Sequence, residues 1–71
     1  MRVIIYTRGE KMKFREVEKI LLEDGWKFKG AKGSHYQYIH SYKKGKVTIP
    51  RHNGALDIKT VKTILKQAGI E

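Results

Sequence analysis

Residues 32–40, Lys-Gly-Ser-His-Tyr-Gln-Tyr-Ile-His, contain two of the three histidines in a chain that has no cysteine. Histidine titrates near neutrality, so His35 could accept or donate a proton in a reaction at physiological pH. It could also be an exposed polar residue at the start of a β-strand. The residue types alone favour this second interpretation, because a single histidine among lysines does not define a catalytic site.

Other catalytic and metal-binding groups are scarce around His35. Residues 25–56 contain seven basic residues and no acidic one. A carboxylate pair, or a metal-dependent nuclease built from Asp and Glu, is therefore not expected there. The spacing of His35, His40 and His52 does not resemble that of a zinc site. We expect no metal and no cofactor.

The charge of the chain indicates the kind of partner. Sixteen Lys and Arg against seven Asp and Glu give a formal net charge of +9. Such a surface attracts nucleic-acid phosphates, an acidic protein or an anionic membrane. No apolar run is long enough for a membrane span or a signal peptide, so the membrane is the weakest of these. We expect a soluble, cytoplasmic protein that binds nucleic acid.

Hydrophobic periodicity predicts the elements that must position these residues. Apolar residues at helical spacing predict a first helix over residues 13–24, which Gly25 ends, and a last helix that Asp57 caps and Gly69 ends. A turn is expected at residues 30–33. Apolar and polar residues alternate in three segments that predict strands, at residues 26–29, 34–40 and 47–49.

The order of these elements predicts an α+β fold with an α-β-β-β-α layout. Consecutive strands with short connections pair antiparallel, and both helices must bury their apolar stripes against one face of the three-stranded sheet. The other face is then open to solvent. Tyr36 and Tyr38 share one face of the second strand and His35 lies on the other. We expect the tyrosines inward, because they offer the greater burial, and His35 outward.

Three lysines of the last helix, Lys59, Lys62 and Lys66, lie at spacings that form one exposed stripe. A solvated helix face and a nucleic-acid contact both remain open for it. The tyrosines are needed for a core this small, so we make no prediction that they read bases.

Several segments match a known family as a set. They are Val-Glu-Lys-Ile-Leu-Leu at 17–22, Asp-Gly-Trp at 24–26, Lys-Gly-Ser-His at 32–35, His40, Lys-Gly-Lys-Val-Thr-Ile-Pro at 44–50 and Thr-Val-Lys-Thr-Ile-Leu-Lys-Gln-Ala-Gly at 60–69. With them, residues 12–70 resemble the HicA family of mRNA interferase toxins from HicAB toxin–antitoxin modules. The resemblance implies a double-stranded-RNA-binding-domain-like fold and a catalytic histidine at His35. The chain departs from the family at Ile39, where a polar or basic residue is more usual.

The resemblance also implies an activity. It is that of a metal-independent endoribonuclease acting on single-stranded RNA, with His35 as the general base on the 2′-hydroxyl. We expect Lys32 and Lys46 to hold phosphate, and Gly33 and Ser34 to bring the backbone close to the RNA. Further RNA contacts are expected from Lys44, Lys59 and Lys62.

The family implies a partner as well, a HicB-type antitoxin. Against a surface of this charge, an acidic antitoxin that covers His35 is the sensible inhibitor. DNA binding would belong to the antitoxin. We expect residues 12–71 to form the toxin domain and residues 1–11 to be a flexible, dispensable extension.

Two alternatives remain open at this point. One is a non-catalytic RNA-binding module of the same fold, and the other is a protein-interaction domain that only docks an acidic partner. Purified protein incubated with RNA separates them, by cleavage, binding without cleavage, or neither.

Overall fold

The structure is a computed structural model that describes residues 11–51 and 54–70. The predicted α-β-β-β-α order is confirmed, with a short strand added before each helix. The elements in this part of the chain are β1 (Lys11–Lys13), α1 (Phe14–Glu23), β2 (Trp26–Lys32), β3 (His35–His40), β4 (Val47–Pro50), β5 (Ala55–Asp57) and α2 (Ile58–Gln67). The predicted extension, residues 1–11, lies outside the described residues except for Lys11.

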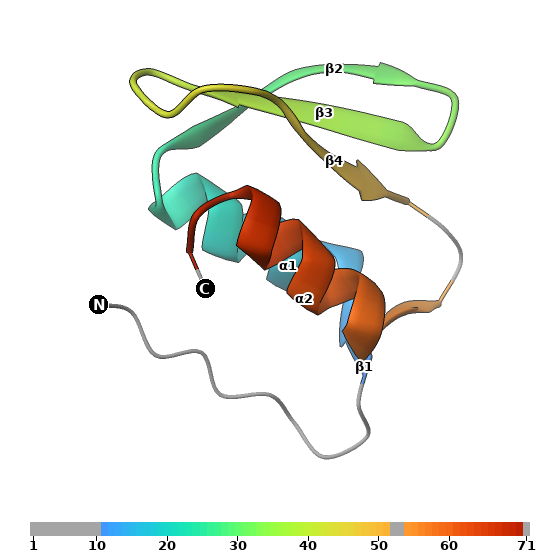
Figure 1. Cartoon of the computed structure of the whole chain (residues 1–71). Coiled ribbons are helices and arrows are strands. Elements are labelled where there is room, and N and C mark those ends of the chain that lie inside the picture. The colour runs from blue at the N-terminus through green and yellow to red at the C-terminus, as the bar shows by residue number, and fades with distance from the viewer. Residues whose placement is uncertain (1–10, 52–53, 71) are drawn as a thin grey trace.

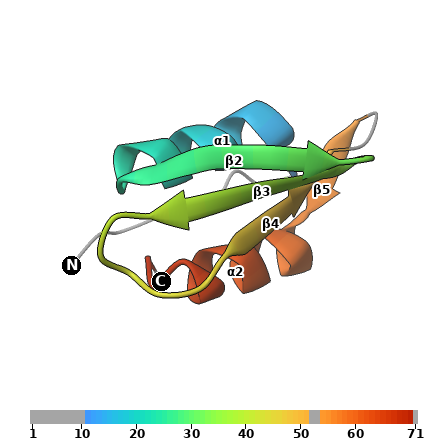
Figure 2. The same ribbon diagram turned by 90° about the horizontal axis from the view of Figure 1, so that it is seen from above.

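An antiparallel sheet of order β2-β3-β4 covers both helices (Figure 1). Helix α1 contacts β2 and β4, and α2 contacts β4 (Figure 2). The other face of the sheet carries neither helix, as the sequence predicts. Burial of apolar surface between these two layers, worth about 25 cal/mol per Å², is the main force that holds them together. Among the described residues, the largest fully buried side chains are Val17, Leu21, Trp26, Tyr38, Val47, Ile49, Val61 and Leu65.

The predicted orientation of β3 is confirmed. Tyr38 is fully buried and Tyr36 packs partly buried against the core, whereas His35 and Ile39 are exposed. The Tyr38 hydroxyl donates a hydrogen bond to Glu18 Oε2 at 2.5 Å, which satisfies its polar end beneath the sheet. Two aromatic rings therefore fix which face of β3 looks outward, and they place His35 on the open face.

The hairpin between β2 and β3 is tighter than predicted. The prediction of a turn over residues 30–33 is wrong, because β2 continues to Lys32 and only residues 33–34 turn the chain. The register shifts between Phe28 and Gly30, which makes Lys29 the extra residue of a β-bulge. Gly33 carries the turn with φ 62°, a left-handed conformation that glycine adopts without strain.

A second small sheet was missed from the sequence. Strand β1 pairs antiparallel with β5, with Met12 opposite Leu56 and Lys11 opposite Asp57. Each of these strands leads directly into a helix, so the pair ties the start of α1 to the start of α2. Asp57 occupies the N-cap position of α2 as expected, but its side chain makes no capping hydrogen bond.

Glycines end both helices, as predicted. Gly25 has φ 102° and Gly69 has φ 70°. At the end of α2 the backbone N–H groups of Gly69 and Ile70 donate to the carbonyls of Lys66 and Leu65, which is the Schellman arrangement. Within the residues that the structure describes, no helix has the length and apolar character needed to cross a membrane.

Candidate functional site

The molecule has two ends that differ in what they carry. The turn end comprises the 33–34 turn, the start of β3, the end of β4 and the starts of both helices (Figure 1). The clamp end comprises the connection of residues 41–46 and the ends of both helices. The candidate catalytic histidine lies at the turn end.

His35 begins β3 and is exposed. It pairs with Lys32 on β2 and with Pro50 on β4. Paired residues of an antiparallel sheet point to the same face, so these three side chains form one row across the open face. Within the described residues, no hydrogen bond or ion pair engages the His35 side chain. Its imidazole is therefore available to a molecule that approaches from solvent.

The turn before His35 is fixed from two sides. Gly33 supplies the positive φ, and a Cβ built on it would meet no atom within 4 Å. The glycine is thus required by the backbone conformation, and the space in front of it is open. The carbonyl of Ser34 accepts a hydrogen bond from the Arg51 N–H at 2.7 Å, which joins the turn to the end of β4. Together these features hold the start of β3 in place.

The rest of the open face is free of carboxylates. Gln37 lies opposite Gly30 and Thr48, and Ile39 lies opposite Lys27. All of these residues belong to the acid-free segment 25–56. The open face therefore offers cations and neutral groups to a ligand, which suits a polyanion.

The lysines expected to bind RNA are not gathered around His35. Lys32 is its direct neighbour across the β2–β3 pair. Lys46 precedes Val47, which pairs with Tyr38. At about 3.3 Å per residue, Lys46 lies roughly 13 Å from His35 along the strand. Lys46 and His35 are therefore too far apart to contact the same phosphate group.

Three other predicted contacts lie on other elements. Lys44 is exposed in the connection at the clamp end. Lys59 is in the first turn of α2 and Lys62 follows one turn later, both on the helix layer. These lysines can widen a positive surface, but they do not share one phosphate with Lys32.

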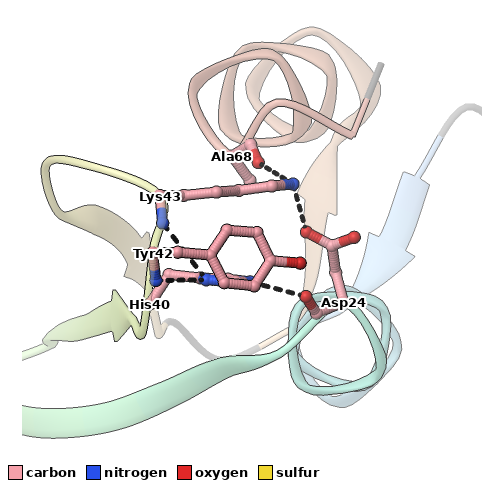
Figure 3. Close-up of polar contacts among 5 residues, drawn as sticks. All are labelled: Asp24, His40, Tyr42, Lys43 and Ala68. Carbon is pink, nitrogen blue, oxygen red and sulfur yellow. Dashed lines mark hydrogen bonds and ion pairs between the residues drawn. The ribbon is translucent and has the colours of Figure 1, made fainter.

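His40, at the other end of β3, has its ring nitrogens hydrogen-bonded within the protein (Figure 3). Its Nδ1 lies 3.3 Å from the backbone N–H donors of both Tyr42 and Lys43. Nδ1 must accept there, so the proton is on Nε2, which donates to the Asp24 carbonyl at 2.7 Å. The ring also lies on the opposite face of β3 from His35. His40 therefore cannot assist His35.

Lys43 completes the clamp (Figure 3). Its Nζ donates to Asp24 Oδ2 at 2.5 Å and to the Ala68 carbonyl at 3.1 Å. One lysine thus joins the 41–46 connection to the ends of α1 and α2. Gly25 leaves room for this arrangement, since a Cβ there would lie 2.7 Å from His40 Nε2. The clamp end is built for stability.

Arg51 is a residue that the sequence did not single out. Its guanidinium carbon lies 4.9 Å from the centre of the Phe14 ring and 5.4 Å from that of Tyr36. In the sequence it is marked only as a basic residue after Pro50. No hydrophobic pattern predicts the conformation of that segment. Arg51 places a fixed cation at the turn end.

The histidine set considered for zinc is not brought together. His35 and His40 lie at opposite ends of β3, and His52 lies outside the described residues. Across residues 11–51 and 54–70, no group of three or more His, Cys, Asp or Glu side chains is placed to hold a metal ion.

The fold and the exposed basic face define a small α+β domain whose layout is consistent with a double-stranded-RNA-binding-domain-like fold. A family model described as the HicA toxin of bacterial toxin–antitoxin systems matches residues 14–70, a span that contains both helices and the β2-β3-β4 sheet. The chain therefore belongs to the HicA toxin family, and the resemblance seen in its motifs is confirmed. The family is that of the toxin component of a toxin–antitoxin module. A comparison with curated proteins finds no match.

Proposed function

We propose that this toxin is an mRNA interferase, an endoribonuclease that cleaves single-stranded mRNA with His35 as the general base. The observation that carries the proposal is the position of His35. It is exposed on an acid-free face, beside Lys32, with both ring nitrogens available to substrate. Family membership supports the same activity. The cytoplasm, where mRNA is translated, is the compartment that fits it.

The reaction needs little from the protein because RNA carries its own nucleophile. A ring nitrogen of His35 takes the proton of the 2′-hydroxyl, and the 2′-oxygen attacks the adjacent phosphorus in line. The bond from phosphorus to the 5′-oxygen breaks, leaving a 2′,3′-cyclic phosphate. The 5′-oxygen takes its proton from solvent water, which reaches this exposed site. Lys32 stabilises the charge that develops on the non-bridging oxygens.

This mechanism uses no metal-bound water, because the nucleophile is the 2′-hydroxyl. It predicts that the toxin cleaves RNA in EDTA and that the product carries a 2′,3′-cyclic phosphate. His35→Ala should lower the cleavage rate about 10²–10⁴-fold while RNA binding is retained. A variant that cleaves at nearly the wild-type rate, or a wild-type reaction abolished by EDTA, would contradict the mechanism. Binding without any cleavage would leave the RNA-binding module as the function.

The lysines and the turn supply binding in this proposal. Lys32, Lys44, Lys46, Lys59 and Lys62 bind phosphates at separate points along the RNA, and Gly33 and Ser34 let the RNA backbone approach the start of β3. Removing one lysine–phosphate interaction should flatten the salt dependence of binding by about 0.7 log units per log of salt. Neutralising Lys32 should therefore change both binding and rate, whereas neutralising Lys44 should change binding alone.

The antitoxin is proposed to be a HicB-type protein with an acidic surface. A surface of net charge +9 favours such a partner, and His35 is reachable only from the open face that the partner would cover. Direct DNA binding by the toxin is not part of the proposal. In the copurified complex, cleavage should be suppressed and His35 protected from a histidine-specific reagent. A complex that left His35 reactive would contradict direct occlusion.

A further inference from the structure

A hollow with a volume of about 320 Å³ opens at the turn end, on the side of the helix layer. It is lined by the start of α1, the residue after β4 and the start of β5. Its lining residues are Lys13, Phe14, Arg15, Arg51, Gly54 and Ala55. Three of these six are cations and none is acidic. Glu16, the acidic residue in the first turn of α1, instead accepts the Lys13 backbone N–H at 2.8 Å.

The Arg51 guanidinium is held in position within this hollow. It lies over Phe14 and Tyr36, whose rings meet edge to face with their centres 5.1 Å apart. Stacking on two aromatic rings restricts the arginine while leaving its N–H donors at the guanidinium edge. An arginine oriented in this way loses little conformational entropy when it binds a phosphate with two parallel hydrogen bonds.

The hollow adjoins the row that contains His35. The Arg51 N–H donates to the Ser34 carbonyl at 2.7 Å, and the next pair of the ladder is His35 with Pro50. Side chains alternate along the strand, so His35 faces the open side while Arg51 faces the helices. An RNA strand with one nucleotide at His35 can therefore continue around this end of the sheet into the hollow.

We propose that the hollow is a second phosphate subsite, which binds an RNA phosphate neighbouring the one that is cleaved. The proposal rests on the RNA-cleaving function and adds to it a place where the rest of the strand is held. Two arginine forks and one lysine match the charge and shape of a phosphodiester. The volume lies at the lower end of the range for ligand pockets, about 300–1,000 Å³, and so suits one nucleotide.

Binding measurements with a single-stranded RNA of about ten nucleotides test this subsite. Arg15→Gln and Arg51→Gln are compared with the intact chain, each also carrying His35→Ala so that no RNA is consumed. Lys19→Gln is the matched control, because it removes one exposed positive charge from α1 at a position that does not line the hollow. Thermal unfolding of each variant shows whether Arg51→Gln disturbs the fold, and Arg51→Lys retains the charge without the planar fork.

Because the two arginines share one phosphate, each arginine variant should flatten the salt dependence of binding by up to about 0.7 log units per log of salt, which is up to about five-fold in affinity at 0.1 M salt. The Lys19 control should change the slope by much less. With His35 intact, the variants should raise KM on this RNA with little change in kcat, and cleavage of a dinucleotide should not change. A dinucleotide reaches His35 but does not reach the hollow.

The outcomes separate this proposal from the function on which it rests. RNA binding whose affinity and salt slope are the same in Arg15→Gln and in the Lys19 control would overturn the subsite alone, and would leave an acidic segment of the antitoxin as the occupant. Binding that depends on Arg15 and Arg51 without any cleavage would support the subsite and overturn the nuclease. An intact chain that binds no RNA would overturn both.

Discussion

Strand β3 has a histidine at each end, and the two differ in their contacts and exposure. His40, at the clamp end, has both ring nitrogens engaged and packs edge to face on Trp26, with ring centres 5.2 Å apart. His35, at the turn end, is exposed and engages no other described side chain. The two residue types are identical, so the role of each is set by the elements around it.

Two lysines, Lys43 and Lys32, show the same difference between the two ends. Lys43 at the clamp end bonds an aspartate and a helix carbonyl, and about a quarter of its side chain is exposed. Lys32 at the turn end is exposed beside His35. Polar groups that hold a fold are satisfied within it, whereas those that act on a ligand are left for the ligand to satisfy. The clamp end stabilises the domain, and the turn end carries the groups to which the proposed function assigns the chemistry.

The largest expected effect on stability comes from Gly25→Ala at the clamp end. The left-handed backbone costs roughly 1–2 kcal/mol with a Cβ, and that Cβ also displaces His40 from its hydrogen bond, for about 1 kcal/mol more. A total destabilisation of about 2–3 kcal/mol is expected by denaturant unfolding. Gly33→Ala is the matched control at the turn end, where a Cβ meets nothing. Equal destabilisation by the two would mean that the hydrogen bond of His40 contributes no stability.

Tyr38, between the two ends, predicts how stability depends on alkaline pH. Burial first, and then the hydrogen bond to Glu18, hold the pKa of Tyr38 well above its ordinary value near 10. The unfolded chain therefore loses this proton near pH 10 while the folded one keeps it. The stabilisation that Tyr38 contributes is complete below pH 10. Above pH 10 the free energy of unfolding falls by up to about 1.4 kcal/mol per pH unit. In Tyr38→Phe this part of the alkaline destabilisation should vanish, and an unchanged profile would contradict the assignment.

A smaller effect is expected from Lys43→Met. It removes the ion pair with Asp24 and the bond to the Ala68 carbonyl, and because these groups are partly exposed the cost is about 1 kcal/mol. Cleavage by the folded protein should be unchanged. Lys44→Met, one residue on and exposed, should alter stability by less than about 0.5 kcal/mol. If Lys43→Met lowered the cleavage rate of fully folded protein, the clamp end would be part of the active surface.

The smallest effect is expected from shortening the chain to begin at Met12. It removes one pair of the β1–β5 ladder, Lys11 with Asp57, both exposed. Terminal residues contribute little unless they are tied down, so folding and RNA cleavage should both be retained. A shortened chain that failed to fold or to cleave would place residues 1–11 within the functional domain.

The features of the fold that the sequence predicts are those that depend on hydrophobic periodicity. Both helices, the inward tyrosines and the exposure of His35 follow from apolar spacing and from the small size of the core. The bulge at Lys29 and the strands β1 and β5 were not predicted. A single extra residue, or a strand of three residues, is too short to show a hydrophobic periodicity. The Lys43 clamp and the Arg51 hollow were missed because they join segments distant in sequence, and only the fold brings those together.

The most direct test of this account compares His35→Ala with His40→Ala, by cleavage rate per folded molecule and by free energy of unfolding. His35→Ala should lower the rate about 10²–10⁴-fold and change stability by less than about 0.5 kcal/mol. His40→Ala should cost about 2 kcal/mol of stability, because it removes the hydrogen bonds of the ring and its packing on Trp26, and should leave the rate of the folded protein unchanged. A His35→Ala toxin that cleaves like the wild type, or a folded His40→Ala toxin that does not cleave, would contradict the division of roles between the two ends.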